Sequence, residues 1–154
     1  MTTFVSTNDK VIVKLLNWLI KALSKDKSRP VLNGVFIRNG KMTAVDGFRM
    51  HEIPTPEMLR EYTGKILEMG TTKAGAGIPI VEIEGKFPDC EELWPKRDPE
   101  FVIGVNPKYL IDALSAPPSD DTPMAILRFW GEHSPLQVDI GETRSLIMPM
   151  HIPD

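Results

Sequence analysis

The chain changes between two hydrophobic rhythms, helical spacing and strict alternation, which predicts a fold of mixed helices and strands. After residue 9, apolar side chains recur every three or four positions, at Ile12, Leu15, Leu16, Leu19 and Leu23. This spacing predicts one buried face of a helix that Thr7 or Asn8 caps and that runs to about Ser24. A second helix is predicted after Asn106-Pro107, because a capping residue followed by proline favours a helix start.

Strands are predicted where short runs rich in β-branched and aromatic residues lie between turn residues. They span residues 4–6, 31–37, 41–46, 48–53, 78–84, 101–105, 124–130, 136–140 and 145–152. Asn39-Gly40 is a strong signal for a two-residue hairpin, and Thr55-Pro56 is expected to cap and start a short helix. The glycine-rich residues 70–77 predict a mobile linker, because they lack the Gly-Lys-Ser/Thr of a phosphate-binding loop.

The last predicted strand carries an apolar face of its own, formed by Leu146, Met148, Met150 and Ile152 at every second position. Pro149 cannot donate to a strand ladder, so the strand should follow a sheet edge or form a bulge. Methionines beside a proline suit either an adaptable binding surface or ordinary core filling. From this stretch alone, core filling is the favoured interpretation.

The order of predicted elements repeats along the chain. Residues 4–53 run strand, helix, strand, strand, strand, and residues 101–152 run through the same order. Such a repeat indicates a pseudo-symmetric α+β domain with two helices packed on antiparallel sheets. We therefore expect one domain over residues 1–154, with halves at about 1–55 and 101–154 and an inserted segment at about 56–100.

Composition is typical of a globular chain of the cytoplasm. Of 154 residues, 42% are hydrophobic and 25% charged, and no apolar run reaches the length of about 18 that a membrane span needs. The N-terminus lacks the plan of a signal peptide. The single cysteine, Cys90, excludes an intramolecular disulfide and fits a reducing compartment.

The net charge of −3 argues against nucleic acid, but the charge is unevenly distributed. Residues 10–29 hold six basic side chains against Asp26 alone: Lys10, Lys14, Lys21, Lys25, Lys27 and Arg29. On a helix, Lys10, Lys14, Asn17, Lys21 and Lys25 would form a row opposite the apolar face. For a single helix, a solvated face is the commoner explanation of such a row.

The sequence offers little for catalysis. His51, His133 and His151 are widely separated and match no metal motif. Cys90 has no base beside it in sequence, so a buried or incidental thiol is favoured. Three acids, Asp112, Asp139 and Glu142, form no recognisable carboxylate pair. We expect no enzyme activity, no cofactor and no metal.

Six segments stand out by their content and order: Arg-Pro-Val-Leu-Asn-Gly-Val at 29–35, Ala-Val-Asp-Gly-Phe-Arg-Met at 44–50, Glu-Gly-Lys-Phe-Pro-Asp at 84–89, Asn-Pro-Lys-Tyr-Leu-Ile-Asp-Ala-Leu at 106–114, Ser-Pro-Leu at 134–136 and Leu-Ile-Met-Pro-Met at 146–150. Together they resemble parts of the middle and third domains of the bacterial sliding clamp, the beta subunit of DNA polymerase III. The chain differs at Val45, Phe48 and Cys90-Glu91-Glu92, where the family has threonine, histidine and tyrosine with basic residues. The resemblance implies a single, shortened DNA-clamp domain.

The resemblance implies sequence-independent binding of double-stranded DNA by basic helix residues that line the hole of a ring. The matching positions are Lys10, Lys14, Lys21, Lys25, Lys27, Arg29 and Lys108. Lys108 stands four residues before Asp112, and this pair would cancel part of the charge of the second helix. A ring with the geometry of the family would require self-association of six copies.

The resemblance also implies a hydrophobic cleft for short peptides of DNA polymerases and other clamp clients. The matching positions are Gly47, Phe48, Arg49, Met50, Pro88, Leu93, Leu146, Met148, Pro149 and Met150. Phe48 is large enough to fill the pocket, and Glu91 and Glu92 would change its rim. The expected function is that of a non-catalytic processivity factor in DNA replication, or a docking module for clamp-binding peptides. The alternative is a clamp-derived regulator or decoy that binds proteins without encircling DNA.

Overall fold

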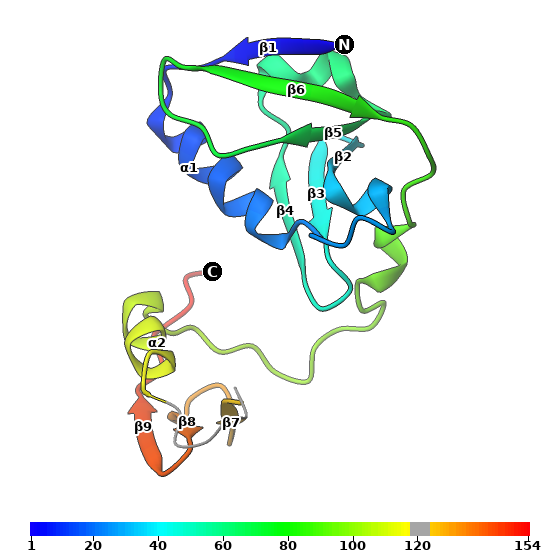
Figure 1. Cartoon of the computed structure of the whole chain (residues 1–154). Helices are drawn as coiled ribbons and strands as arrows, with labels where there is room; N and C mark the ends of the chain where they lie inside the picture. The colour runs from blue at the N-terminus through cyan, green and yellow to red at the C-terminus, as the bar shows by residue number, and fades with distance from the viewer. Residues whose placement is uncertain (118–123) are drawn as a thin grey trace. The chain divides into compact units, whose positions relative to one another are not determined.

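The computed structural model describes residues 1–117 and 124–154 and divides the chain into two compact units, Met1–Trp94 and Pro95–Asp154 (Figure 1). Each unit combines helix with an antiparallel sheet, which confirms the predicted α+β class. The predicted boundary near residue 55 does not coincide with a boundary between units. The two units are described separately below.

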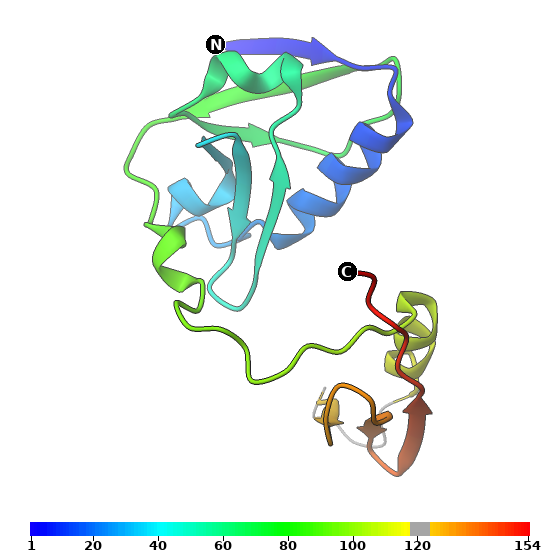
Figure 2. The same cartoon turned by 180° about the vertical axis from the view of Figure 1, so that it is seen from behind.

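The first unit is built on a six-stranded sheet with the order β1-β6-β5-β2-β3-β4. Its strands are β1 (Thr2–Ser6), β2 (Val35–Arg38), β3 (Lys41–Val45), β4 (Met50–Pro54), β5 (Ile66–Met69) and β6 (Gly77–Ile83). Helix α1 (Lys10–Leu19) packs on this sheet, as the view from behind shows (Figure 2). Short 3₁₀ turns complete the unit: η1 (Ile20–Ala22), η2 (Pro30–Asn33), η3 (Glu57–Tyr62) and η4 (Cys90–Leu93).

Helix α1 is shorter than its sequence pattern predicts and is capped by a different residue. The Asp9 carboxylate accepts hydrogen bonds from the backbone N–H groups of Val11 at 2.8 Å and Ile12 at 3.3 Å. The predicted caps, Thr7 and Asn8, are therefore wrong; the Thr7 hydroxyl instead accepts a bond from the Asp9 N–H. Because the chain tightens into η1 after Leu19, the helix does not reach Ser24.

The main core lies between α1 and the sheet. Leu16 and Leu19 of the helix belong to one buried cluster with residues of five strands, among them Ile37, Met42 and Leu67. A second cluster holds Leu32, Val45, Ile66 and Phe87. The predicted apolar stripe of α1 is wrong at Leu15, which is exposed beside Val11 and Trp18. The helix thus has a second apolar face that the first unit leaves open.

Two predictions for the connections in the first unit differ in outcome. The Asn39-Gly40 hairpin is confirmed, since both residues have positive φ (52° and 74°) between paired β2 and β3. Residues 70–77 are not a linker: they join β5 to β6. The Asn17 amide donates to the Thr72 carbonyl at 3.0 Å, and the Thr72 N–H donates back at 2.9 Å. Part of the predicted insertion therefore lies inside this sheet.

Two further local predictions need correction. Residues 30–33 form η2 rather than the start of a strand, which begins only at Val35. Thr55 does not cap a helix, because η3 follows Pro56 without a side-chain cap. The Thr55 hydroxyl is buried, and it has no hydrogen-bond partner among the described residues.

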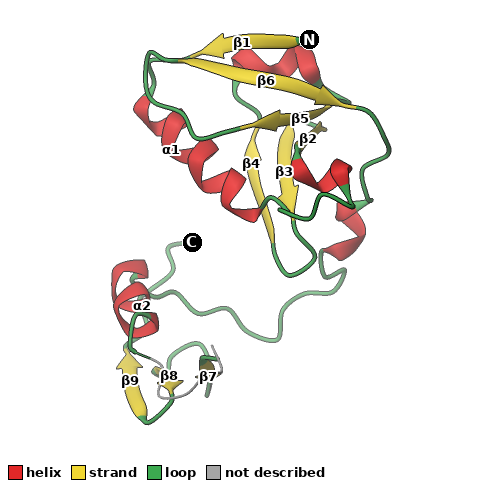
Figure 3. Cartoon of the chain, viewed as in Figure 1, coloured by secondary structure: helices red, strands yellow, loops and turns green. Residues whose placement is uncertain are grey.

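The second unit places helix α2 (Pro107–Leu114) with three strands, β7 (Ile126–Arg128), β8 (Leu136–Ile140) and β9 (Thr143–Ile147), in the order β7-β8-β9 (Figure 3). The Asn106 side chain accepts a bond from the Lys108 N–H at 2.9 Å, which confirms the predicted helix start. A buried cluster under α2 is formed by four side chains: Leu136, Val138, Ile140 and Ile147.

The second unit has less strand than its sequence pattern predicts. Within the described part of the chain, residues 101–105 form only an isolated bridge, in which the Met150 N–H donates to the Gly104 carbonyl at 2.7 Å. The last strand ends at Ile147, before Pro149, and β7 is shorter than residues 124–130. Pro118 and the predicted loop at 119–123 lie outside the described residues.

The predicted repeat is visible as a helix followed by a three-stranded antiparallel meander in each unit. The first copy is α1 with β2, β3 and β4, and the second is α2 with β7, β8 and β9. Only the first copy is preceded by a strand, β1. Among the described residues, we find no helix with the length and hydropathy of a membrane span.

Candidate functional site

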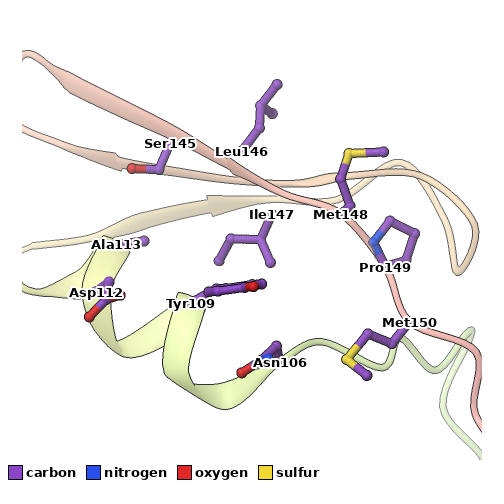
Figure 4. A pocket seen from close by; sticks show the side chains of 10 residues that line it. All are labelled: Asn106, Tyr109, Asp112, Ala113, Ser145, Leu146, Ile147, Met148, Pro149 and Met150. Atoms are coloured by element: carbon purple, nitrogen blue, oxygen red, sulfur yellow. The ribbon is translucent and has the colours of Figure 1, made fainter.

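A hollow lies in the second unit, between α2 and the chain from β9 onward. Its volume is about 750 Å³. Figure 4 shows the ten side chains that line it: Asn106, Tyr109, Asp112, Ala113, Ser145, Leu146, Ile147, Met148, Pro149 and Met150. Four of the predicted cleft residues therefore contribute to one surface, and all four come from the same chain segment: Leu146, Met148, Pro149 and Met150.

The alternation of side chains along β9 sets up this hollow. Ile147 is buried and points toward Tyr109, whereas Leu146 and Met148 point away from α2 (Figure 4). Met148 is 67% exposed and Met150 is 55% exposed. Core filling, the interpretation favoured from the strand alone, is therefore wrong for both methionines. The regular alternation ends where the strand ends, ahead of Pro149.

The sequence did not identify the α2 side of the hollow. Asn106, Tyr109 and Ala113 are spaced by three and four residues, so they share one face of the helix. The Asn106 side chain is used in the helix cap, and the Tyr109 side chain is exposed. This spacing is the signal in the sequence that groups the three residues on one helix face.

The other predicted cleft residues belong to the first unit. Gly47 has φ of +93° in the turn between β3 and β4, and Phe48 next to it is 98% exposed. Met50 is half-buried and packs on the second cluster of that unit, whereas Pro88 and Leu93 are exposed. A cleft that combines these positions with Met148 and Met150 stays a prediction.

The turn that carries Phe48 is held by Asp46. Its carboxylate accepts hydrogen bonds from the backbone N–H groups of Phe48 at 2.9 Å and Arg49 at 3.1 Å. These bonds hold the pKa of Asp46 below its usual value, because they stabilise the ionised carboxylate, and the bond from Phe48 contributes most. The Arg49 guanidinium adds an ion pair to Asp46 at 3.4 Å and donates to the Lys21 carbonyl.

The predicted basic residues do not form one row on a helix. Lys10 and Lys14 lie in α1, but Lys21 lies in η1, and Lys25, Lys27 and Arg29 lie in the loop after it. All six are exposed, and so is Lys108 on α2 in the second unit. The predicted row fails for two reasons. The helix ends at Leu19, ahead of Lys21 and Lys25, and the Asn17 side chain is engaged in a hydrogen bond to the Thr72 carbonyl.

One further contact was not predicted. The rings of Trp18 and His51 stack with centroids 3.9 Å apart and planes 8° apart, and the His51 Nδ1 lies 2.9 Å from the Trp18 carbonyl. The stack joins the end of α1 to β4.

The residues considered for catalysis do not converge. Burial raises the pKa of the Cys90 thiol, and the charges of Asp89 and Glu91 act in the same direction. Hydrogen bonds from Gln137 and then Arg128 lower the pKa of Asp139. No group of three or more His, Cys, Asp or Glu side chains suited to a metal occurs in residues 1–117 and 124–154.

The chain has the fold of the bacterial DNA sliding clamps. The sliding clamp of Bartonella birtlesii, solved bound to griselimycin, matches with a TM-score of 0.61 and 18% identity over 99% of this chain and 52% of that chain. The Bacillus subtilis clamp matches with a TM-score of 0.60 and 17% identity, over 96% of this chain and 49% of that chain. The DNA polymerase III beta chain of Streptococcus pneumoniae matches with a TM-score of 0.59 and 17% identity, over 98% of this chain and 50% of that chain.

The chain thus spans about half the length of these three clamps. At such identities the likeness establishes the fold. No protein-family model matches the sequence, and neither does any curated protein.

Proposed function

We propose that the protein is a non-catalytic, clamp-like docking module for short apolar peptides of the kind that DNA polymerases and other clamp clients carry. The observation that carries this proposal is the hollow of about 750 Å³ beside α2, with Leu146, Met148 and Met150 exposed along it. Exposed methionines next to an aromatic side chain form a soft apolar surface, and such surfaces accept apolar anchor residues of varied shape. The known binding of griselimycin by the Bartonella birtlesii clamp is compatible with this proposal.

Changing Met148 or Met150 to alanine should weaken peptide binding about ten-fold, because each change removes apolar contact area from the hollow. The fold should tolerate both changes, because both side chains are largely exposed and the free energy of unfolding should change by less than about 0.5 kcal/mol. Fluorescence anisotropy with labelled peptides from replicative polymerases measures the binding, and urea unfolding measures the stability.

Met124→Ala is the matched control, since Met124 is exposed in the same unit but does not line the hollow. Equal binding by all three variants and the original chain would contradict the docking site. A large loss of stability in Met148→Ala would instead restore the core interpretation of this residue.

We further propose that the protein acts in the cytoplasm in DNA replication, as a processivity factor that self-associates around double-stranded DNA. The exposed Lys10 and Lys14 on α1 support contact with phosphates. The open apolar face of α1, formed by Val11, Leu15 and Trp18, supports self-association. The alternative is a regulator that binds peptides but does not encircle DNA, and the net charge of −3 favours it.

Native mass, measured over a range of concentrations with and without a DNA duplex, separates the two versions. A processivity factor should form an oligomer, a ring of six copies in the geometry of the resemblance, and DNA should stabilise it. Its DNA affinity should fall steeply as salt rises. A monomer at every concentration that binds peptides but no duplex would eliminate the ring and favour the regulator.

A further inference from the structure

Two adjoining hollows of about 580 Å³ each lie in the first unit, between the chain that follows α1 and the turn between β3 and β4. Five residues line both hollows: Lys21, Leu23, Ser24, Lys25 and Arg49. The surface is therefore continuous from one hollow into the other. It belongs to one unit, so it does not depend on the docking site in the second unit.

The linings of these hollows are basic in a chain that is acidic overall. Five cations line them: Lys21, Lys25, Lys27, Arg29 and Arg49. Three acids do so as well, Asp26, Asp46 and Glu68, which leaves a local charge of +2 against −3 for the whole chain. Asp46 is already engaged by Arg49. None of the four other cations forms an ion pair with a described residue.

Phe48 is presented at the edge of this basic surface. It lines the hollow that Arg29 also lines, and its side chain is almost fully exposed. Burial of a phenylalanine side chain is normally favourable, so full exposure on an ordered turn is informative. The two hydrogen bonds to the Asp46 carboxylate and the bond from Arg49 to the Lys21 carbonyl fix this turn against the basic segment.

We propose that this surface binds a single-stranded nucleic acid, with phosphates on Lys21, Lys25, Lys27 and Arg29 and one base stacked on Phe48. Cations along a groove together with an exposed aromatic ring are the elements of sequence-independent single-strand binding. A duplex offers the same phosphates, but its bases are stacked on one another, so Phe48 discriminates in favour of the single strand. An acidic peptide would also pair with the cations, but it has no base to stack on Phe48. The experiment below distinguishes an acidic peptide from a single-stranded nucleic acid.

The probe is a fluorescein-labelled oligo(dT) of about 12 nucleotides, a length within the usual site sizes. Phe48→Ala should weaken binding of this oligonucleotide about ten-fold, since stacking of one base is lost. Phe4→Ala is the matched control, because Phe4 is an exposed phenylalanine on β1 that lines neither hollow. An oligomer of abasic sugar phosphates of equal length should bind as weakly to the original chain as oligo(dT) binds to Phe48→Ala.

The salt dependence tests the cations. Lys27→Ala should make the slope of log K against log salt shallower by about 0.7, the value for one phosphate contact on a single strand. Lys73→Ala, an exposed lysine on the loop between β5 and β6 that lines neither hollow, should leave the slope unchanged.

Three results would overturn the proposal: equal affinity in Phe48→Ala and the original chain, equal affinity for the abasic oligomer and oligo(dT), or tighter binding of a duplex of the same length. An acidic peptide that displaces oligo(dT) but binds equally to Phe48→Ala would also assign the surface to peptides. Because Met148 and Met150 lie in the other unit, their effect on peptide binding can fail or succeed independently of these results.

Discussion

Leu16→Ala should lower the free energy of unfolding of the first unit by about 3 kcal/mol, the middle of the range for leucine-to-alanine changes in a core. Leu16 is 1% exposed and belongs to the cluster that joins α1 to the sheet. Removing its branched end would leave a cavity under the helix, where the surrounding strands are paired and cannot collapse freely. Urea unfolding followed by circular dichroism and tryptophan fluorescence measures the loss.

Leu15→Ala is the matched control for this prediction, because it changes the same side chain one position earlier on the same helix. Leu15 is 37% exposed and does not belong to the buried cluster, so the loss should stay below about 1 kcal/mol. Similar losses for the two variants would show that α1 is packed in a different rotation from the one described.

Gly34→Ala should cost about 2–3 kcal/mol, in the upper part of the range for overpacking a core. A Cβ at this position would lie 2.9 Å from the Ile66 side chain, the Ile83 side chain and the backbone carbon of Leu67. The side chains have some freedom to move, but the Leu67 backbone is fixed by its pairing with Val35. The change should lower the urea midpoint without altering the dependence on urea.

Gly70→Ala provides the comparison, since a Cβ there meets nothing within 4 Å and the backbone is not left-handed. Its effect on stability should stay within about 0.5 kcal/mol. If both alanine variants unfold at the midpoint of the original chain, then the close approach of β5 to Gly34 is wrong.

Elements defined by a few neighbouring residues could be predicted from the sequence. The Asn39-Gly40 hairpin depends on two residues that accept positive φ, and the start of α2 depends on the Asn106 side chain and Pro107. Strand β5 had no such signal, because Ile66 and Leu67 belong to different buried clusters. A strand buried on both faces shows no alternation, so its pattern cannot be told from a loop or a helix segment.

The candidate sites could be predicted only in part, for a related reason. The period of two grouped Leu146 with Met148, but periodicity does not say whether a face is covered. The exposure of Met148 and Met150 depends on which elements cover β9 and the residues that follow it. In the same way, the dipeptide Asp46-Gly47 is by itself a turn signal, but the contact of Arg49 in this turn with the Lys21 carbonyl depends on tertiary packing.

The sequence by itself determined the α+β class, the repeated order of helix and strands, and the basic character of residues 10–29. Tertiary structure alone decided that α1 ends at Leu19 and that the chain after it returns to the turn carrying Phe48. Caps, turns and helix faces depend on residues within a few positions, which a sequence displays directly. The basic surface around Phe48 depends on residues more than twenty positions apart, which the packing of η1 on β3 and β4 brings together.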